Sequence, residues 1–161
     1  MDKQTPVKIN KDSLKAIKEI VDELLKLLEV EVKPVVEEKD GLVNIQLQTD
    51  NPGILIGYHG DTLASLQIML SMMVYRKLGS WVKILVDVGD YRERRKETLD
   101  KMALSAAQKV KFSGQDYAFP PMSSGDRRII HIALSENPDV TTESQGEGFE
   151  RRVVVKPKNV S

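Results

Sequence analysis

The sequence predicts an α+β protein built from two small units. Several segments have apolar residues at helical spacing, others alternate apolar with polar residues as half-buried strands do, and glycine or proline separates these segments. The chain has 161 residues, 40% of them hydrophobic, which suffices for one domain or two small ones. No apolar run reaches the ~20 residues of a membrane helix, and residues 1–10 lack the apolar core of a signal peptide. We therefore expect a soluble, cytoplasmic protein without a membrane segment.

The first predicted unit has the order helix, strand, strand, helix, helix, strand. Its segments are a helix over 12–29 capped by Asp12 or Ser13, strands over 30–38 and 43–48, a helical turn over 54–56, a helix over 61–78 and a strand over 82–88. Asp40-Gly41 is a hairpin signal, which makes the first two strands antiparallel. Asn51-Pro52 is expected to cap the helical turn.

The second predicted unit has two helices and a small antiparallel sheet. Its segments are a helix over 91–112 with Met102 among its inward residues, an extended piece over 117–122, a helix over 124–134, and strands over 140–144 and 151–156. Ser123 and Asp126 resemble a capping box before the second helix. The expected division is a tail over 1–11, a first domain over 12–89 and a second over 90–158.

Composition excludes several kinds of active site. The chain has no cysteine and only two histidines, His59 and His131, which removes thiolate zinc sites, disulfides and cysteine nucleophiles. Neither histidine accompanies a known nucleophile signature, and no carboxylate cluster has obvious metal-ligand spacing. We therefore expect a protein that is not an enzyme and that has no metal site and no cofactor.

Arginine is concentrated in the second unit, although the formal net charge is zero. Only Arg76 precedes residue 91. The other arginines are Arg92, Arg94, Arg95, Arg127, Arg128, Arg151 and Arg152. A planar guanidinium suits phosphate better than an ammonium does, so this distribution favours an anion-facing second unit. Solvated helix and strand faces would also account for it.

The segment Gly57-Tyr58-His59-Gly60 joins two predicted helices of the first unit. Glycines let the backbone approach a ligand closely, and the helix that follows directs N–H groups at an anion. Within the order of elements around it, this loop resembles the Gly-x-x-Gly loop of a type II KH domain, over residues 12–89. The resemblance implies that the loop clamps about four nucleotides of single-stranded RNA or DNA. KH loops usually carry Lys or Arg between the glycines, whereas this one has Tyr58 and the mostly neutral His59, so we expect weaker attraction for phosphate. Stacking of Tyr58 on a base or sugar would offset that loss.

Arg127 and His131 lie four residues apart in the last predicted helix and so share one face, where a fixed charge and a titratable donor suit a phosphate. With the segments 142–148 and 151–157, this pair resembles the R-three-H domain, which is named for Arg-x-x-x-His and binds single-stranded nucleic acid. A KH unit followed directly by this module resembles the Jag family, whose members are also called KhpB, EloR or SpoIIIJ-associated protein. The candidate nucleic-acid-binding residues are Gly57, Tyr58, His59, Gly60, Arg94, Arg95, Arg127, Arg128, His131, Arg151 and Arg152.

The resemblance implies a bacterial single-stranded RNA-binding protein, an RNA chaperone linked to cell elongation or sporulation, with single-stranded DNA as a second possible ligand. It also implies a small single-KH protein as partner, or a homodimer. Family members usually carry an N-terminal Jag domain and a charged linker as well, so we expect either a fragment or a short member. The alternative is a protein-interaction adaptor that uses the KH-like unit for dimerisation or docking.

Two expectations concern single residues. As an exposed turn, the loop is expected to keep its fold when Gly57→Asp and His59→Asp are combined, while RNA binding weakens. Arg127 is expected to anchor a phosphate, with His131 adding positive charge as the pH falls towards 6. The alternative role for Arg127 is an ion pair with Asp126 or Glu150 that serves folding.

Overall fold

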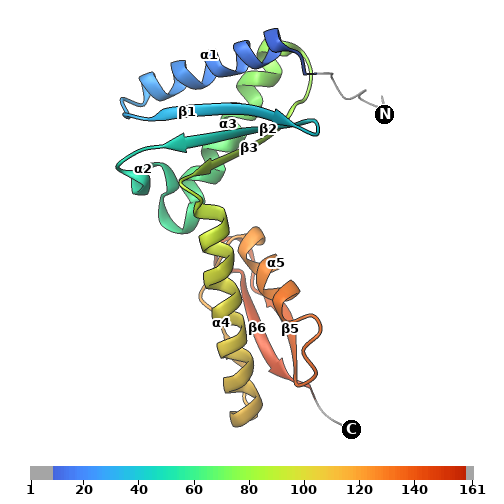
Figure 1. The fold of residues 1–161 in the computed structure, drawn as a ribbon. Coiled ribbons are helices and arrows are strands. Elements are labelled where there is room, and N and C mark those ends of the chain that lie inside the picture. The colour runs from blue at the N-terminus through green and yellow to red at the C-terminus, as the bar shows by residue number, and fades with distance from the viewer. Residues whose placement is uncertain (1–8, 159–161) are drawn as a thin grey trace. The chain divides into compact units, whose positions relative to one another are not determined.

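The computed structural model describes residues 9–158, which form two compact units that divide between Tyr91 and Arg92. Each unit has its own sheet and its own hydrophobic core (Figure 1). Of the expected tail over 1–11, residues 1–8 lie outside the described residues, and the first helix already begins at Lys11. No helix within residues 9–158 is both long and apolar enough to cross a membrane.

The first unit has the predicted order of elements. They are α1 (Lys11–Leu27), β1 (Lys33–Lys39), β2 (Leu42–Gln48), α2 (Pro52–Ile56), the 3-10 turn η1 (Tyr58–Gly60), α3 (Asp61–Leu78) and β3 (Lys83–Val88). The sheet order is β1-β2-β3, with β1 antiparallel and β3 parallel to β2. A parallel pair needs a crossover connection, and α2, η1 and α3 supply it. The loop between the two glycines therefore lies within this crossover.

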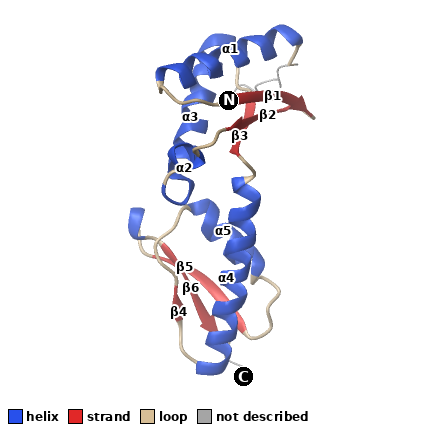
Figure 2. Cartoon of the chain, turned by 60° about the vertical axis from the view of Figure 1, so that its left-hand side comes forward, coloured by secondary structure: helices blue, strands red, loops and turns tan. Residues whose placement is uncertain are grey.

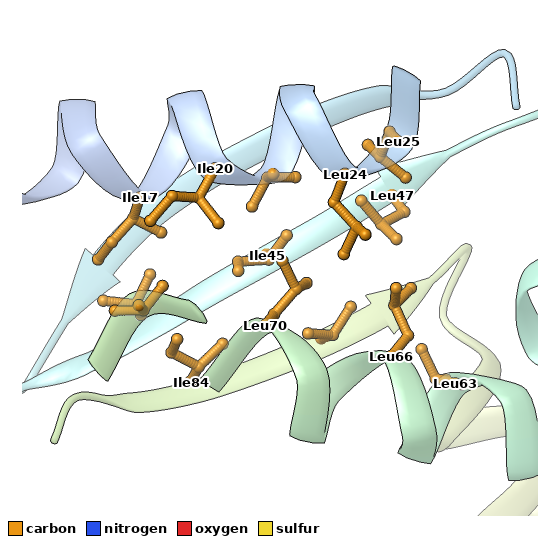
Figure 3. Packing of buried hydrophobic residues seen from close by; sticks show 14 of the residues in the cluster. Ile17, Ile20, Leu24, Leu25, Ile45, Leu47, Leu63, Leu66, Leu70 and Ile84 are labelled. Atoms are coloured by element: carbon orange, nitrogen blue, oxygen red, sulfur yellow. The ribbon is translucent and has the colours of Figure 1, made fainter. Parts of the chain in front are cut away.

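The core of the first unit lies between its sheet and the helices α1 and α3. Strand β2 buries Val43, Ile45 and Leu47, while Asn44 and Gln46 alternate towards the other face. Figure 3 shows Ile17 and Leu24 of α1 and Leu66 and Leu70 of α3 in the same cluster as Ile45 and Leu47. Burying such an aliphatic side chain contributes about 1.5–3 kcal/mol. This packing fixes both helices and thereby the crossover that contains the loop.

The cap of α1 differs from the prediction. The structure places it at Asn10, whose Oδ1 accepts hydrogen bonds from the backbone N of Ser13 at 2.8 Å and from the Ser13 hydroxyl at 2.9 Å. The prediction at Asp12 or Ser13 is wrong because the first three helical residues are polar, and the apolar periodicity that marks the helix begins only at Leu14. Asn51 does precede α2, but its side chain makes no capping hydrogen bond.

The second unit also has the predicted architecture, two helices with a small antiparallel sheet (Figure 2). Its elements are α4 (Tyr91–Ser113), β4 (Tyr117–Ala118), α5 (Ser124–Ala133), β5 (Val140–Gln145), the 3-10 turn η2 (Gly148–Glu150) and β6 (Arg152–Pro157). The sheet order is β4-β6-β5, and both pairs are antiparallel. The model therefore confirms an α+β fold with helices and sheet in both units.

The core of the second unit joins α4 and α5 to the central strand β6. Leu99 and Val110 of α4, Ile130 of α5, and Val153 and Val155 of β6 are buried in one cluster. The prediction that Met102 points inward is wrong, since it is 38% exposed. Alanines occupy most of the inward face of α4 instead, at positions 103, 106 and 107, and small residues let a helix approach its neighbours closely.

Candidate nucleic-acid interface

Gly57 can only be glycine in this loop. Its φ of +70° lies in the left-handed region that L side chains rarely adopt. A Cβ at this position would lie 2.0 Å from Oγ1 of Thr62 and 3.0 Å from the backbone N of Thr62. The expectation that Gly57→Asp leaves the fold intact is therefore wrong: the turn is exposed, but the site of a side chain is filled by the first turn of α3.

Gly60 is fixed for the same two reasons. Its φ is +91°, and a Cβ there would lie 2.9 Å from the ring carbon Cε1 of Tyr91. Gly60 also stands at the N-cap of α3 without a side-chain capping bond. The N–H of Asp61, the first of α3, donates to the carbonyl of Tyr58, so only the N–H groups that follow it in the first turn of α3 face the side from which anions bind helix N-termini.

The two residues between the glycines form an aromatic pair. The ring centroids of Tyr58 and His59 lie 4.0 Å apart with the planes tilted by 46°. Tyr58 is 76% exposed, and His59 has a φ of +50°. The next residue, Asp61, is acidic. The loop thus presents backbone and ring surface to a ligand, and it has no side chain with a permanent positive charge.

In the second unit, an ion pair anchors the start of α5. Asp126 is buried, and its Oδ2 accepts from Nη2 of Arg95 at 2.7 Å and from Nε at 3.2 Å. The Oγ of Ser123 accepts from the backbone N of Asp126 at 3.2 Å, which confirms Ser123 as the cap. The carboxylate of Asp126, which would complete the predicted capping box, pairs with Arg95 instead. Arg95, a candidate nucleic-acid contact, thus has its side chain largely buried in a pair that holds α5 against α4.

Arg127 does not form the ion pair considered for it. Asp126 pairs with Arg95, and Glu150 pairs with Arg152. Within residues 9–158 the Arg127 side chain has no ion-pair or hydrogen-bond partner, and its Nε is buried. A buried donor that lacks a partner is costly. Nε is closed to solvent, so an anion would reach this half-buried side chain through its terminal Nη groups.

His131 is held by two hydroxyl groups of β5, the strand beside α5 (Figure 1). Its Nδ1 lies 2.7 Å from Oγ1 of Thr142, and its Nε2 lies 2.8 Å from Oγ of Ser144. Burial, and then the charge of Arg127, lower the pKa of His131 below its ordinary value of 6.5. The pKa thus shifts against the expected gain of charge near pH 6.

Thr142 and Ser144 are functional candidates that the sequence interpretation did not single out. The available signal was the period of two along β5, which places both hydroxyls on one face of the strand. What the sequence could not give is the pairing of that face with His131, since α5 and β5 are joined by a loop of irregular backbone.

The remaining arginine candidates of the second unit differ in their exposure and in their hydrogen bonds. Arg94 and Arg128 are exposed on α4 and α5. Nη1 of Arg151 donates to the carbonyl of Gly146 at 2.9 Å, and Nη2 of Arg152 donates to Glu150 at 3.0 Å. Surface pairs of this kind contribute little and exchange readily. The candidates thus form two groups, the loop in the first unit and the arginines with His131 in the second.

Among the described residues, no cluster of three or more histidine, cysteine or carboxylate side chains could hold a metal ion. The loop offers hydrogen-bond donors and ring surface, whereas the second unit offers hydrogen-bond donors and positive charge. These are the chemical features that suit a nucleic-acid strand.

Comparison with known proteins finds one matching family model in each of the two units. The family model "KhpA/KhpB, KH domain" matches residues 15–86, and the model of the R-three-H domain matches residues 97–157. RNA-binding protein KhpB of Clostridium symbiosum is 36% identical over 146 residues, covering 91% of this chain and 65% of the relative. RNA-binding protein KhpB of Bacillus subtilis is 34% identical over 125 residues, covering 76% of this chain and 60% of the relative. The corresponding protein of Lactiplantibacillus plantarum is 34% identical over 146 residues, which cover 91% of this chain and 45% of that relative.

The chain therefore spans between 45% and 65% of the length of these curated relatives. Its first unit carries the matched KH domain, and its second unit carries the matched R-three-H domain. The chain belongs to the KhpA/KhpB family through its KH domain, which an R-three-H domain follows.

Proposed function

We propose that the chain binds single-stranded RNA and catalyses no reaction on it. The observation that carries the proposal is the partly desolvated guanidinium of Arg127, which has no partner within residues 9–158. A phosphate would bind the terminal Nη groups of this side chain, and arginine is the side chain best shaped to bind it. The names of the relatives, RNA-binding protein KhpB, support RNA as the source of that phosphate.

The loop of the KH unit would act through its backbone. Gly57 and Gly60 allow the sugar-phosphate chain to approach, and the positive end of the α3 dipole faces its negative charge, although the N–H of Asp61 is already bonded to the carbonyl of Tyr58. Tyr58, whose side chain is largely exposed, stacks on a base or sugar. His59 completes the aromatic surface beside Tyr58. Single-stranded DNA offers the same backbone and is a second possible ligand.

The R-three-H unit would hold phosphates through its arginines. Arg127 is the anchor, and the exposed Arg94 and Arg128, with the half-buried Arg151 and Arg152, add positive potential to the unit. These side chains offer no array aimed at base edges, so the unit positions the strand and does not read its sequence. Arg95 acts indirectly, because its pair with Asp126 fixes the helix that carries Arg127.

In the cell we propose a role as an RNA chaperone of the bacterial cytoplasm, with a link to cell elongation or sporulation. Two weak contacts with the nucleic-acid backbone suit a chaperone, which must bind many sequences and release them. The bacterial relatives of the same name support the setting.

A second candidate function is a protein-interaction adaptor, and the outer face of α3 favours it. Ile68 is 62% and Met72 60% exposed on this face. Tyr75 stacks on Trp81 with ring centroids 4.6 Å apart, and both rings are about half exposed. An apolar patch of this kind marks interaction sites in many proteins. The partner would be a second copy of this chain or a small single-KH protein.

The deciding experiment is a titration of labelled single-stranded RNA over a salt series, with Arg127→Ala as the variant and Arg76→Ala as the matched loss of one arginine. We expect the parent to lose affinity as salt rises. Arg127→Ala should reduce the magnitude of the logarithmic salt slope by about 0.7, one phosphate contact on a single strand, and weaken all sequences about equally. Arg76→Ala, on α3, should leave the slope unchanged.

Absent or salt-independent binding by the parent would contradict RNA binding. Combined with a molar mass that rises with protein concentration, it would support the adaptor. A lower melting temperature of Arg127→Ala with normal affinity per folded molecule would instead make Arg127 a structural residue.

A further inference from the structure

We propose that His131 acts as a neutral positioning residue, which holds the hydroxyls of Thr142 and Ser144 so that one of them donates to the phosphate bound by Arg127. This inference rests on the proposed RNA binding of the second unit. It assigns to β5 a direct contact with the ligand and removes His131 from the ligand's contacts.

His131 has no ring nitrogen left for a ligand. Nδ1 and Nε2 both lie within 2.8 Å of hydroxyl oxygens of its own chain, one from Thr142 and one from Ser144. A phosphate could reach the ring only by displacing one of these bonds. The two hydroxyls, in contrast, belong to half-buried side chains that solvent still reaches.

The protons of the imidazole and of the two hydroxyls leave one hydroxyl able to donate. A neutral imidazole carries one N–H, so one nitrogen donates and the other accepts. The hydroxyl that receives the N–H keeps its own proton for another acceptor, whereas the hydroxyl that donates to the ring has used its proton. In either tautomer the arrangement therefore leaves one hydroxyl donor free, near the helix face that carries Arg127.

The charged groups around His131 favour its neutral form. Arg127 faces His131 from the same helix, and its charge together with burial opposes protonation of the ring. From β5, Glu143 lies between the two hydroxyl residues but alternates to the opposite face, where it is exposed and bonded to Lys156 at 2.6 Å. Asp126 of α5 is committed to Arg95. A neutral His131 beside a charged Arg127 is the state that these surroundings support.

The test removes each hydroxyl without changing charge. Thr142→Val and Ser144→Ala are compared with Thr141→Val, an exposed neighbour on the other face of the same strand. We expect one or both of the first two variants to weaken the binding of labelled single-stranded RNA about 3- to 10-fold, which is typical of a lost hydrogen bond. Their salt slopes should equal that of the parent. Thr141→Val should bind normally, and melting temperatures show that every variant is folded.

A pH series then separates a positioning histidine from a charged one. The chain has two histidines, so the series uses His59→Asn, since asparagine tolerates the left-handed backbone of position 59. In this background we expect affinity to stay constant from pH 7.5 to 6. Adding His131→Ala to this background should weaken binding, and the factor of weakening should be the same at pH 7.5 as at pH 6.

Two results would overturn the inference while leaving RNA binding in place. One is normal affinity of both Thr142→Val and Ser144→Ala in a parent that binds RNA. The other is affinity that rises towards pH 6 in His59→Asn and loses that rise in His131→Ala, which would make His131 a cationic contact. A parent that does not bind RNA would overturn the proposed function itself.

Discussion

At the scale of single residues, His131 links the stability of the second unit to pH. Burial and Arg127 lower its pKa in the folded chain, so the unfolded chain takes up a proton at a higher pH. Between the ordinary pKa of about 6.5 and the lower folded value, the unfolded state binds more protons, and the free energy of unfolding falls as the pH drops through this window. The stabilisation is therefore complete above the ordinary pKa and is lost as the pH falls through the folded one.

We expect the melting temperature of the parent to exceed that of His131→Gln by more at pH 7.5 than at pH 5.5. Glutamine cannot titrate, and all carboxylates are common to both proteins, so the difference isolates the ring. Thermal unfolding followed by circular dichroism at several pH values measures it. A difference that stays constant over this range, or grows towards pH 5.5, would contradict the lowered pKa.

At the scale of elements, the turn between α2 and α3 depends on the contact between Gly57 and Thr62. Gly79 has nearly the same φ, +71° against +70°, but nothing lies within 4 Å of its missing Cβ. Gly79→Ala therefore reports the cost of the left-handed backbone alone, about 1–2 kcal/mol. Gly57 has a ψ of −168°, outside the αL region that Gly79 occupies with a ψ of 10°, so Gly57→Ala adds a less accessible backbone as well as the overlap with Thr62. We expect it to destabilise by about 1–3 kcal/mol more.

Urea unfolding of the two alanine variants checks this expectation. Thr62→Ala in the Gly57→Ala chain should restore only part of the loss, because alanine keeps the Cβ of residue 62 at 2.7 Å and its backbone N at 3.0 Å from the new Cβ. Equal destabilisation by Gly57→Ala and Gly79→Ala would show that the turn can relax away from Thr62. A probe of RNA binding at the loop should therefore change Tyr58 or His59 and leave Gly57 in place.

The same scale shows what the sequence could and could not predict. Periodicity predicted the helices and strands because each pattern is local. In β2, Val43 and Ile45 are buried, whereas the polar residues that alternate with them are more exposed. Contacts between elements produce no local pattern in the sequence. Arg95 has the sequence context of a surface arginine, yet its partner Asp126 lies 31 residues away. The bonds from His131 to β5 likewise depend on tertiary packing, so the hydroxyls of Thr142 and Ser144 could not be identified beforehand.

At the scale of the whole molecule, two units with separate cores each carry one group of candidate binding residues. Because the cores are separate, damage to one group should leave the other unit folded. Two linked weak sites gain affinity only when one strand engages both, and the gain then reflects the effective concentration that linkage creates. The length of the RNA therefore tests whether the units act together.

We expect the parent to bind an oligonucleotide of about 20 nucleotides more tightly than one of about five, which can occupy the loop of only one KH unit. Tyr58→Asp and Arg127→Ala should each abolish most of this gain, since either change leaves one working site. Longer strands also offer more binding registers, but that factor is the same for parent and variants, so the comparison removes it. Fluorescence anisotropy at one salt concentration measures all of these affinities. A gain with length that survives in both single variants would mean that the two units bind RNA independently.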